Sequence, residues 1–181
     1  MSTLTLRPNA AGDNTALISN SPPNYSCVDE NGSGDGDTTR NEGYPAVGGQ
    51  WLYDLYSLPD HASESGTINK VTIYIRHRRW DSGLTTGAGR TVIKTNSTED
   101  RGSTETPPDG TYVLHYKEYT QNPNTSAAWT WGEVDALQVG YNGYAEYDAE
   151  MKNSSRTYVT QVWVEVDYTV AVTFQPWAII M

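Results

Sequence analysis

The chain has 181 residues, which is the length of about one domain. It carries 12 Lys and Arg against 22 Asp and Glu, and this formal net charge of −10 repels phosphate backbones and anionic membrane surfaces. Nucleic acid and membranes are therefore poor candidate partners, and the single cysteine, Cys27, excludes an internal disulfide and a cysteine-based zinc site.

Signals for export and membrane insertion are missing from the sequence as it stands. Residues 1–7 lack the basic and apolar regions of a secretory signal. No stretch approaches the roughly 18 apolar residues that a membrane-spanning helix needs. We therefore expect a protein that is made in the cytoplasm and is soluble.

Hydrophobic residues in the first third of the chain recur mostly with a period of two, which predicts strands with one buried face. Leu4 and Leu6 mark a first strand, and the turn-rich residues 8–14 should end it. A weaker strand is expected at 16–19 and a short one at 25–30, before a polar loop. Residues 50–58 fit both strand and helix templates, and we favour a strand.

The clearest strand of the middle region covers residues 67–80, where Val71, Ile73 and Ile75 point to one side. The basic run at 76–79 could meet acidic neighbours in an assembly or could simply solvate one strand end. A glycine-rich turn at 83–89 then leads to strands at 90–96 and 111–120.

One short helix has a defined start signal. Thr130 and Glu133 fit a capping box, in which the hydroxyl and the carboxylate satisfy free backbone amides at the helix start. Val134 and Leu137 would share the face that packs against a sheet. We expect the helix to end near Leu137 and a strand-like segment to follow up to residue 147.

The last strand has the most regular alternation, and it sets the expected domain organisation. We expect one set of side chains to face inward and the other outward, the inward set being Tyr158, Thr160, Val162, Val164, Val166, Tyr168 and Val170, and the outward set Gln161, Trp163, Glu165, Asp167 and Thr169. The alternation continues to Phe174, and about 17 extended residues span roughly 56 Å. A domain of this size is only about 40 Å across, so this strand must bend or leave the domain.

The residues after this strand are apolar and uncharged, and a soluble monomer would have to hide them. We therefore divide the chain into a β-sandwich domain, residues 1–168, and a C-terminal arm, residues 169–181, that docks on another subunit. The expected interface side chains are Val172, Phe174, Trp177, Ile179 and Ile180. Together these patterns predict an all-β fold: a single antiparallel, jelly-roll-like β-sandwich with one short helix and an extended arm.

Five degenerate motifs spread over residues 4–168 carry a resemblance to a known family: Leu6-Arg7-Pro8-Asn9, Val28-Asp29-Glu30 with Asp37-Thr38-Thr39, residues 68–76, residues 122–137, and Gln161-Val162-Trp163-Val164-Glu165-Val166. In these motifs the chain resembles mostly uncharacterised single-domain β-sandwich proteins encoded among virion genes of tailed phages and in environmental sequences. The resemblance implies a jelly-roll-like sandwich in a virus particle, without an enzymatic role. Residues 169–181 lie outside it.

Enzymatic chemistry has little support in the sequence. His61, His77 and His115 are too scattered to form a metal or triad motif. The chain contains no nucleophile elbow, no phosphate-binding loop, no zinc-protease motif and no dinucleotide fingerprint. We expect a protein that is not an enzyme and has no cofactor, with the one exception of calcium.

Calcium is considered because acidic side chains gather on one glycine-rich loop and offer the oxygen ligands that this ion prefers. The residues concerned are Asp29, Glu30, Asp35 and Asp37. The spacing departs from an EF-hand, since Ser33 stands where the third ligand should be. A solvated turn is the simpler interpretation.

Sugar binding is a second hypothesis, because flat aromatic rings stack on sugar faces while neighbouring polar groups bind hydroxyls. The candidate residues are Trp80, Trp129, Trp131 and Trp163. A chain with one Phe must also build its core from Tyr and Trp, so packing is the competing interpretation of these rings.

The leading functional hypothesis is a structural virion protein of a bacteriophage, most concretely a capsid-decoration or minor capsid subunit. Its partners would be copies of itself and other virion proteins, the major capsid protein foremost, and its location the virion. The alternatives are a carbohydrate-binding receptor or adhesin module at a tail-fibre tip, with a glycan as partner, and a filament subunit joined by strand exchange.

Overall fold

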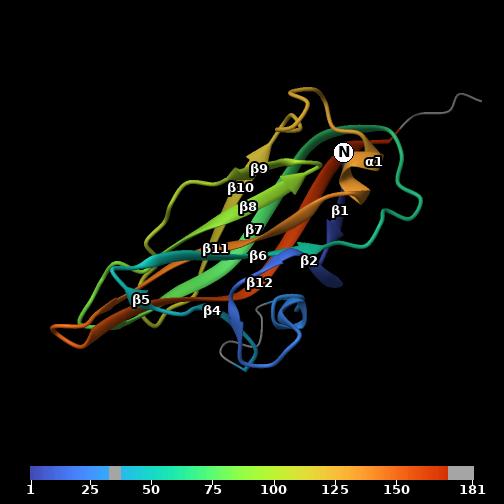
Figure 1. The fold of residues 1–181 in the computed structure, drawn as a ribbon. Helices are drawn as coiled ribbons and strands as arrows, with labels where there is room; N and C mark the ends of the chain where they lie inside the picture. The colour runs from blue at the N-terminus through green and yellow to red at the C-terminus, as the bar shows by residue number, and fades with distance from the viewer. Residues whose placement is uncertain (33–37, 171–181) are drawn as a thin grey trace, which may run out of the picture.

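A computed structural model describes residues 1–32 and 38–170 of the chain (Figure 1). It shows an all-β fold of mainly antiparallel strands, as the sequence predicts, with one short α-helix among the described residues. The strands are β1 (Ser2–Leu6), β2 (Ala10–Thr15), β3 (Ile18–Ser19), β4 (Asn41–Gly43), β5 (Ala46–Val47), β6 (Gln50–Ser57), β7 (Thr67–Ser82), β8 (Ala88–Thr95), β9 (Thr98–Arg101), β10 (Val113–Tyr119), β11 (Gln138–Asp148) and β12 (Asn153–Thr169). The helices are a 3₁₀ turn, η1 (Asn24–Cys27), and α1 (Trp131–Asp135).

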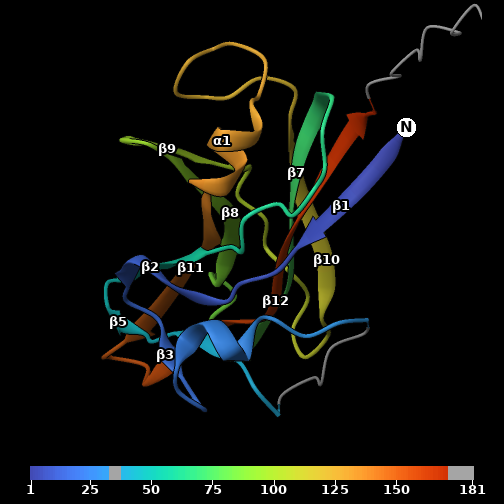
Figure 2. The same ribbon diagram turned by 90° about the vertical axis from the view of Figure 1, so that its right-hand side faces the viewer.

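The strands form two layers, which Figure 2 shows edge-on. The first layer has the order β10-β7-β12, and β1 and β4 pair with successive stretches of the other edge of β12. The second layer has the order β2-β6-β11-β8-β9. A hairpin between β11 and β12 continues one layer into the other, so the sheet curls around its core.

The core lies between the layers and is closed at one end by α1. Val71, Ile73 and Ile75 of β7 face it, as the period-two pattern predicts. Aromatic side chains supply much of its opposite wall, since Tyr56 and Tyr141 are both buried in the cluster. Burying such large rings compensates for the low content of other apolar residues.

The predicted capping box of α1 is confirmed. The Thr130 hydroxyl accepts a hydrogen bond from the Glu133 amide at 3.3 Å, and the Glu133 carboxylate accepts one from the Thr130 amide at 2.8 Å. Val134 and Leu137 are both buried against the core. The cap therefore fixes the start of this short helix at one end of the sandwich.

Two predictions for the first third of the chain are wrong. The turn expected at 8–14 contains β2, which pairs with β6 because Gly12 lets the two backbones approach closely. The strand expected at 25–30 is instead η1, closed by hydrogen bonds from the Ser26 amide to the Pro23 carbonyl and from the Val28 amide to the Tyr25 carbonyl.

The inward orientation predicted for Tyr158 of β12 is wrong. Val159 pairs with His77, and Gln161 pairs with Arg76, the neighbour of His77 on β7. Thr160 therefore has no partner on β7 and forms a β-bulge. The extra residue changes which face the alternate side chains occupy. Val159 therefore faces the core, and Tyr158 lies on the outer face, with the guanidinium of Arg78 over its ring at 4.4 Å.

The strand β12 has 17 residues but begins and ends earlier than the sequence suggests. It ends at Thr169, and the next residue, Val170, is exposed. The predicted interface side chains fall at positions 172–180, outside the described residues, so their docking role stays a prediction.

A buried carboxylate ties the N-terminal segments to β6. Asp54 is fully buried, and its Oδ1 accepts hydrogen bonds from the amides of Ala16 and Leu17 at 2.7 and 2.8 Å. Its Oδ2 accepts from Asn24 at 2.6 Å and from the Tyr56 hydroxyl at 3.2 Å. Burial raises the pKa of Asp54, although all four donors favour the charged form.

Candidate functional site

Two of the three histidines, His77 and His115, are neighbours in the fold, and the third lies elsewhere. His77 is fully buried in the core, 3.2 Å from the Tyr141 hydroxyl, and burial lowers its pKa to about 3. The ring of His115 lies 6.1 Å from that of His77. His61 is at the surface near α1 and contacts Asp135 at 2.7 Å. Within residues 1–32 and 38–170, no group of three or more His, Cys, Asp or Glu is placed to hold a metal ion.

The acidic loop is only partly described. Asp29 and Glu30 lie just after η1, whereas Asp35 and Asp37 lie outside the described residues. The Glu30 side chain accepts a hydrogen bond from the Thr39 hydroxyl on the far side of the loop. Calcium binding by these four residues stays a prediction.

Three of the motifs that carry the family resemblance meet at one place. The guanidinium of Arg7 and the side-chain amide of Gln161 both donate to the carbonyl oxygen of Glu30, the second at 3.0 Å. The Gln161 amide also donates to the Gly32 carbonyl at 3.1 Å, and the Val162 amide donates to the loop at Val28. These residues fasten the 28–32 loop onto β12, which is a structural role.

The four predicted sugar-binding tryptophans do not form one site. Trp129 is 4% exposed and its indole donates to the Tyr119 carbonyl at 3.1 Å, so the expectation that its ring is open for stacking is wrong. The ring of Trp131 packs edge-on against Tyr168 at 5.1 Å. Trp80 is 39% exposed, with Arg156 at 5.6 Å from its ring centre.

The fourth, Trp163, belongs to a row of side chains that crosses the outer face of the first layer. Its ring stacks on Tyr74 at 4.8 Å with an angle of 7° between the planes, and Arg7 covers it from the side of β1 at 5.4 Å. Tyr74 also contacts Tyr116 of β10 at 5.5 Å. Trp163 therefore has an aromatic ring and a guanidinium as neighbours, which compete with a sugar for its ring surface.

The row ends at an open strand edge. Within the part of the chain that the structure describes, β10 pairs with β7 alone, so the backbone groups on its other edge have no strand partner. Two large side chains of β10 are exposed beside this edge, Leu114 by 56% and Tyr116 by 54%. An exposed edge of this kind is a template for the addition of a further strand.

The end of β12 lies at the same end of the first layer as the end of β10. Thr169 pairs with Thr67 at the start of β7, and Tyr119 pairs with Val71 four residues further along. In Figure 2 the end of β12 and the start of β1 lie together at this end. Segment 169–181 therefore begins at the same end of the first layer as the end of β10, with β7 between the two strands.

Comparison with known proteins gives no family. A scan against protein-family models finds no match, and no curated protein matches the chain. Within the described residues, no helix is both long and apolar enough to cross a membrane.

Proposed function

We propose that the protein is a structural subunit of a virus particle, a capsid-decoration or minor capsid protein that associates with its neighbours by strand addition. The open edge of β10, flanked by the exposed side chains of Leu114 and Tyr116, is the observation that carries this proposal. The resemblance of the sequence motifs to virion β-sandwich proteins supports the location in a particle.

Segment 169–181 is the strand that we place on this edge, contributed by another subunit. It has no charged residue and includes five large apolar side chains, at positions 172, 174, 177, 179 and 180. Each large side chain that leaves water contributes about 1.5–3 kcal/mol, before the cost of ordering the segment is subtracted. Main-chain hydrogen bonds to β10 would fix the orientation of the strand.

Sedimentation velocity of the full chain and three variants tests this assembly. A chain that ends at Tyr168 should keep its circular dichroism spectrum and sediment as a monomer, whereas the full chain should form oligomers. Leu114→Lys should also prevent association, because it places a charge beside the edge. Met151→Lys is the matched control, since Met151 is an exposed apolar residue on the β11–β12 hairpin, far from β10.

Association that survives both the deletion and Leu114→Lys would overturn the proposal. Negative-stain microscopy of the same samples separates closed oligomers from open fibres, which the strand-exchange alternative requires. If the full chain forms fibres and the chain that ends at Tyr168 does not, segment 169–181 still mediates association. The protein would then be a filament subunit and not a virion protein.

A further inference from the structure

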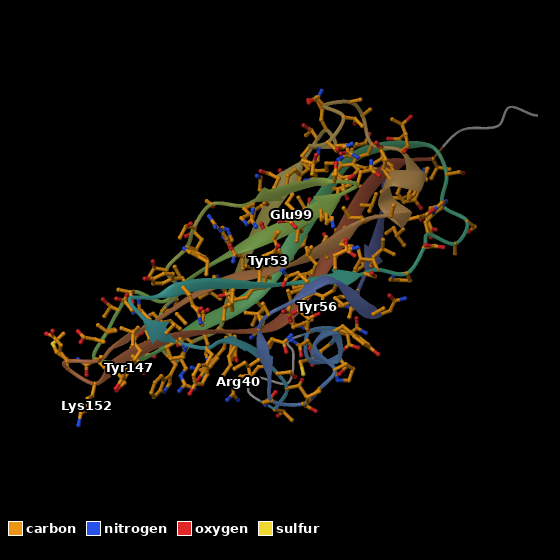
Figure 3. All side chains as sticks on the ribbon, in the orientation of Figure 1. Arg40, Tyr53, Tyr56, Glu99, Tyr147 and Lys152 are labelled. Atoms are coloured by element: carbon orange, nitrogen blue, oxygen red, sulfur yellow. The ribbon has the colours of Figure 1, made fainter. Side chains whose placement is uncertain are left out.

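The outer face of the second layer carries a cluster of arginine and aromatic side chains that the assembly role does not use. We call it the arginine–aromatic patch, and it consists of Trp51, Tyr53, Arg90, Arg101, Asn142 and Tyr144. None of its rings was among the tryptophans that the sequence singled out. Figure 3 shows Tyr53 of β6 beside Glu99 of β9 on this face, and their side chains are joined by a 3.2 Å hydrogen bond.

Strand register brings the patch together from four strands. Asn142 of β11 lies between Tyr53 of β6 and Arg90 of β8, and Trp51 pairs with Tyr144 one step along the same face. Arg101 of β9 reaches the patch from the edge of the layer, with its guanidinium 5.2 Å from the Tyr53 ring centre. The patch therefore rests on rigid backbone rather than on loops.

Arg90 is held in place by neutral groups. Its guanidinium lies over the Trp51 ring at 4.2 Å, and its Nε donates to the Asn142 side-chain oxygen at 2.8 Å. Asn142 is itself fixed, because its amide donates to the Leu52 carbonyl at 3.1 Å. These contacts use the Nε of Arg90 and one face of its guanidinium, and leave the two terminal nitrogens without a described partner.

The two arginines of the patch differ in their acidic neighbours. Arg101 forms an ion pair with Glu99 at 3.0 Å, whereas no carboxylate in residues 1–32 or 38–170 pairs with Arg90. Burial and the neighbouring charge of Arg101 lower the pKa of Arg90, and no acidic group offsets them. An unpaired guanidinium stacked on an indole is unusual in a chain with a net charge of −10.

We propose that the arginine–aromatic patch binds an oligosaccharide that ends in a carboxylated sugar. The terminal nitrogens of Arg90 form the planar fork that a carboxylate accepts as two parallel hydrogen bonds. Trp51 is 37% exposed and offers apolar ring surface to the C–H groups of a sugar. The Tyr144 ring lies 5.4 Å from that of Trp51, and its hydroxyl, which bonds only weakly to Glu146 at 3.4 Å, would bind a sugar hydroxyl.

The charge of the chain argues for this ligand over a nucleic acid. A nucleic acid would bring a long row of phosphates to a chain with a net charge of −10. An oligosaccharide with one terminal carboxylate supplies the anion that Arg90 lacks without that repulsion. The open, shallow face of a sheet also suits a chain of sugar rings better than a deep pocket would.

Immobilised oligosaccharides that end in sialic or glucuronic acid, each printed beside its neutral counterpart, provide the test. The full chain should bind the carboxylated forms at least tenfold more tightly than the neutral forms. Arg90→Gln should remove this preference, Arg90→Lys should weaken it, and Trp51→Ala should weaken binding to the same sugars. Arg76→Gln is the matched control, because Arg76 lies on the outer face of the first layer.

Equal binding of carboxylated and neutral sugars, or binding by Arg90→Gln at full strength, would overturn the proposal. So would a complete absence of binding to all the carboxylated sugars. Thermal unfolding of each variant shows that it is folded, and 3′-sialyllactose should raise the Tm of the wild type and of Arg76→Gln but not that of Arg90→Gln. Oligomeric state is measured separately, so failure here leaves the assembly proposal untouched.

Discussion

Replacing His77 tests whether this buried histidine makes the folded protein less stable at low pH. The unfolded chain carries this histidine with a pKa near 6.5, whereas burial lowers the pKa to about 3 in the folded protein. Between these two pKa values His77 is protonated in the unfolded state and neutral in the folded state. The free energy of unfolding therefore falls as the pH falls from about 6.5 towards 3. Each pH unit below about 6.5 lowers the free energy of unfolding by about 1.4 kcal/mol, so the loss is about 2.7 kcal/mol near pH 4.5.

Urea unfolding at pH 4.5 and at pH 8 measures this difference. His77→Phe should lose some stability at both values, because the Tyr141 hydroxyl loses its neighbour at 3.2 Å. Its loss of stability between pH 8 and pH 4.5 should nevertheless be smaller than that of the wild type by about 2–3 kcal/mol. His61→Gln is the control, because that histidine lies at the surface beside Asp135. Parallel pH profiles for wild type and His77→Phe would refute the reasoning.

Three further substitutions test the contacts that shape the sandwich. Asp54→Ala should lower the free energy of unfolding in urea by about 3–5 kcal/mol, because it leaves the buried Leu17 amide and the buried Tyr56 hydroxyl without an acceptor. Gly140→Ala should cost about 1–3 kcal/mol or more in the same assay, since a Cβ there would lie 1.8 Å from the Asp54 carbonyl oxygen. Thr130→Ala should cost about 1 kcal/mol through the lost helix cap, read from the thermal unfolding curve.

Each of these substitutions has a conservative partner. Asp54→Asn keeps an oxygen for the backbone amides of Ala16 and Leu17, so a loss as large as that of Asp54→Ala would place the effect outside those hydrogen bonds. Gly132→Ala adds a Cβ with nothing within 4 Å. If Gly140→Ala were as stable as Gly132→Ala, β6 and β11 would have space for the added Cβ at position 140. Thr130→Ser keeps the hydroxyl and should behave as the wild type.

Local patterns in the sequence were enough to predict the fold class and several elements. The alternation at Val71, Ile73 and Ile75 identifies the core face of β7, because side chains in a strand alternate between two faces without exception until a bulge intervenes. The capping box of α1 was also readable, since its partners, Thr130 and Glu133, are three residues apart. Both signals depend only on neighbours in the sequence.

The bulge at Thr160 shows where such reasoning fails. One additional residue reverses the two faces of β12, yet nothing in the local composition marks it. Tyr158 consequently looks like a core residue from the sequence, whereas it lies on the outer face between guanidinium groups. Asp54 was missed for a similar reason, because its donors at 16, 17 and 24 belong to distant segments of the chain.

The two candidate surfaces were beyond sequence reasoning because both depend on cross-strand pairing. Arg90 and Trp51 are 39 positions apart and meet only because β8 and β6 both pair with β11. The open edge of β10 depends on the order of strands in the sheet, and the residues of β10 alone do not indicate that order. Leu114, exposed in a period-two segment, is the one signal that could have pointed to that edge.

The positions of these two surfaces bear on whether one protein can serve both roles. The open edge belongs to the first layer, on whose outer face Tyr74 and Trp163 stack on each other and Arg7 lies over Trp163. The arginine–aromatic patch lies on the outer face of the second layer, with the core between the two. Strand addition at β10 therefore extends the first layer sideways and leaves Arg90 facing solvent. A subunit anchored in this way would present the patch outward, so oligomers and monomeric variants should bind the carboxylated sugar with the same affinity per subunit.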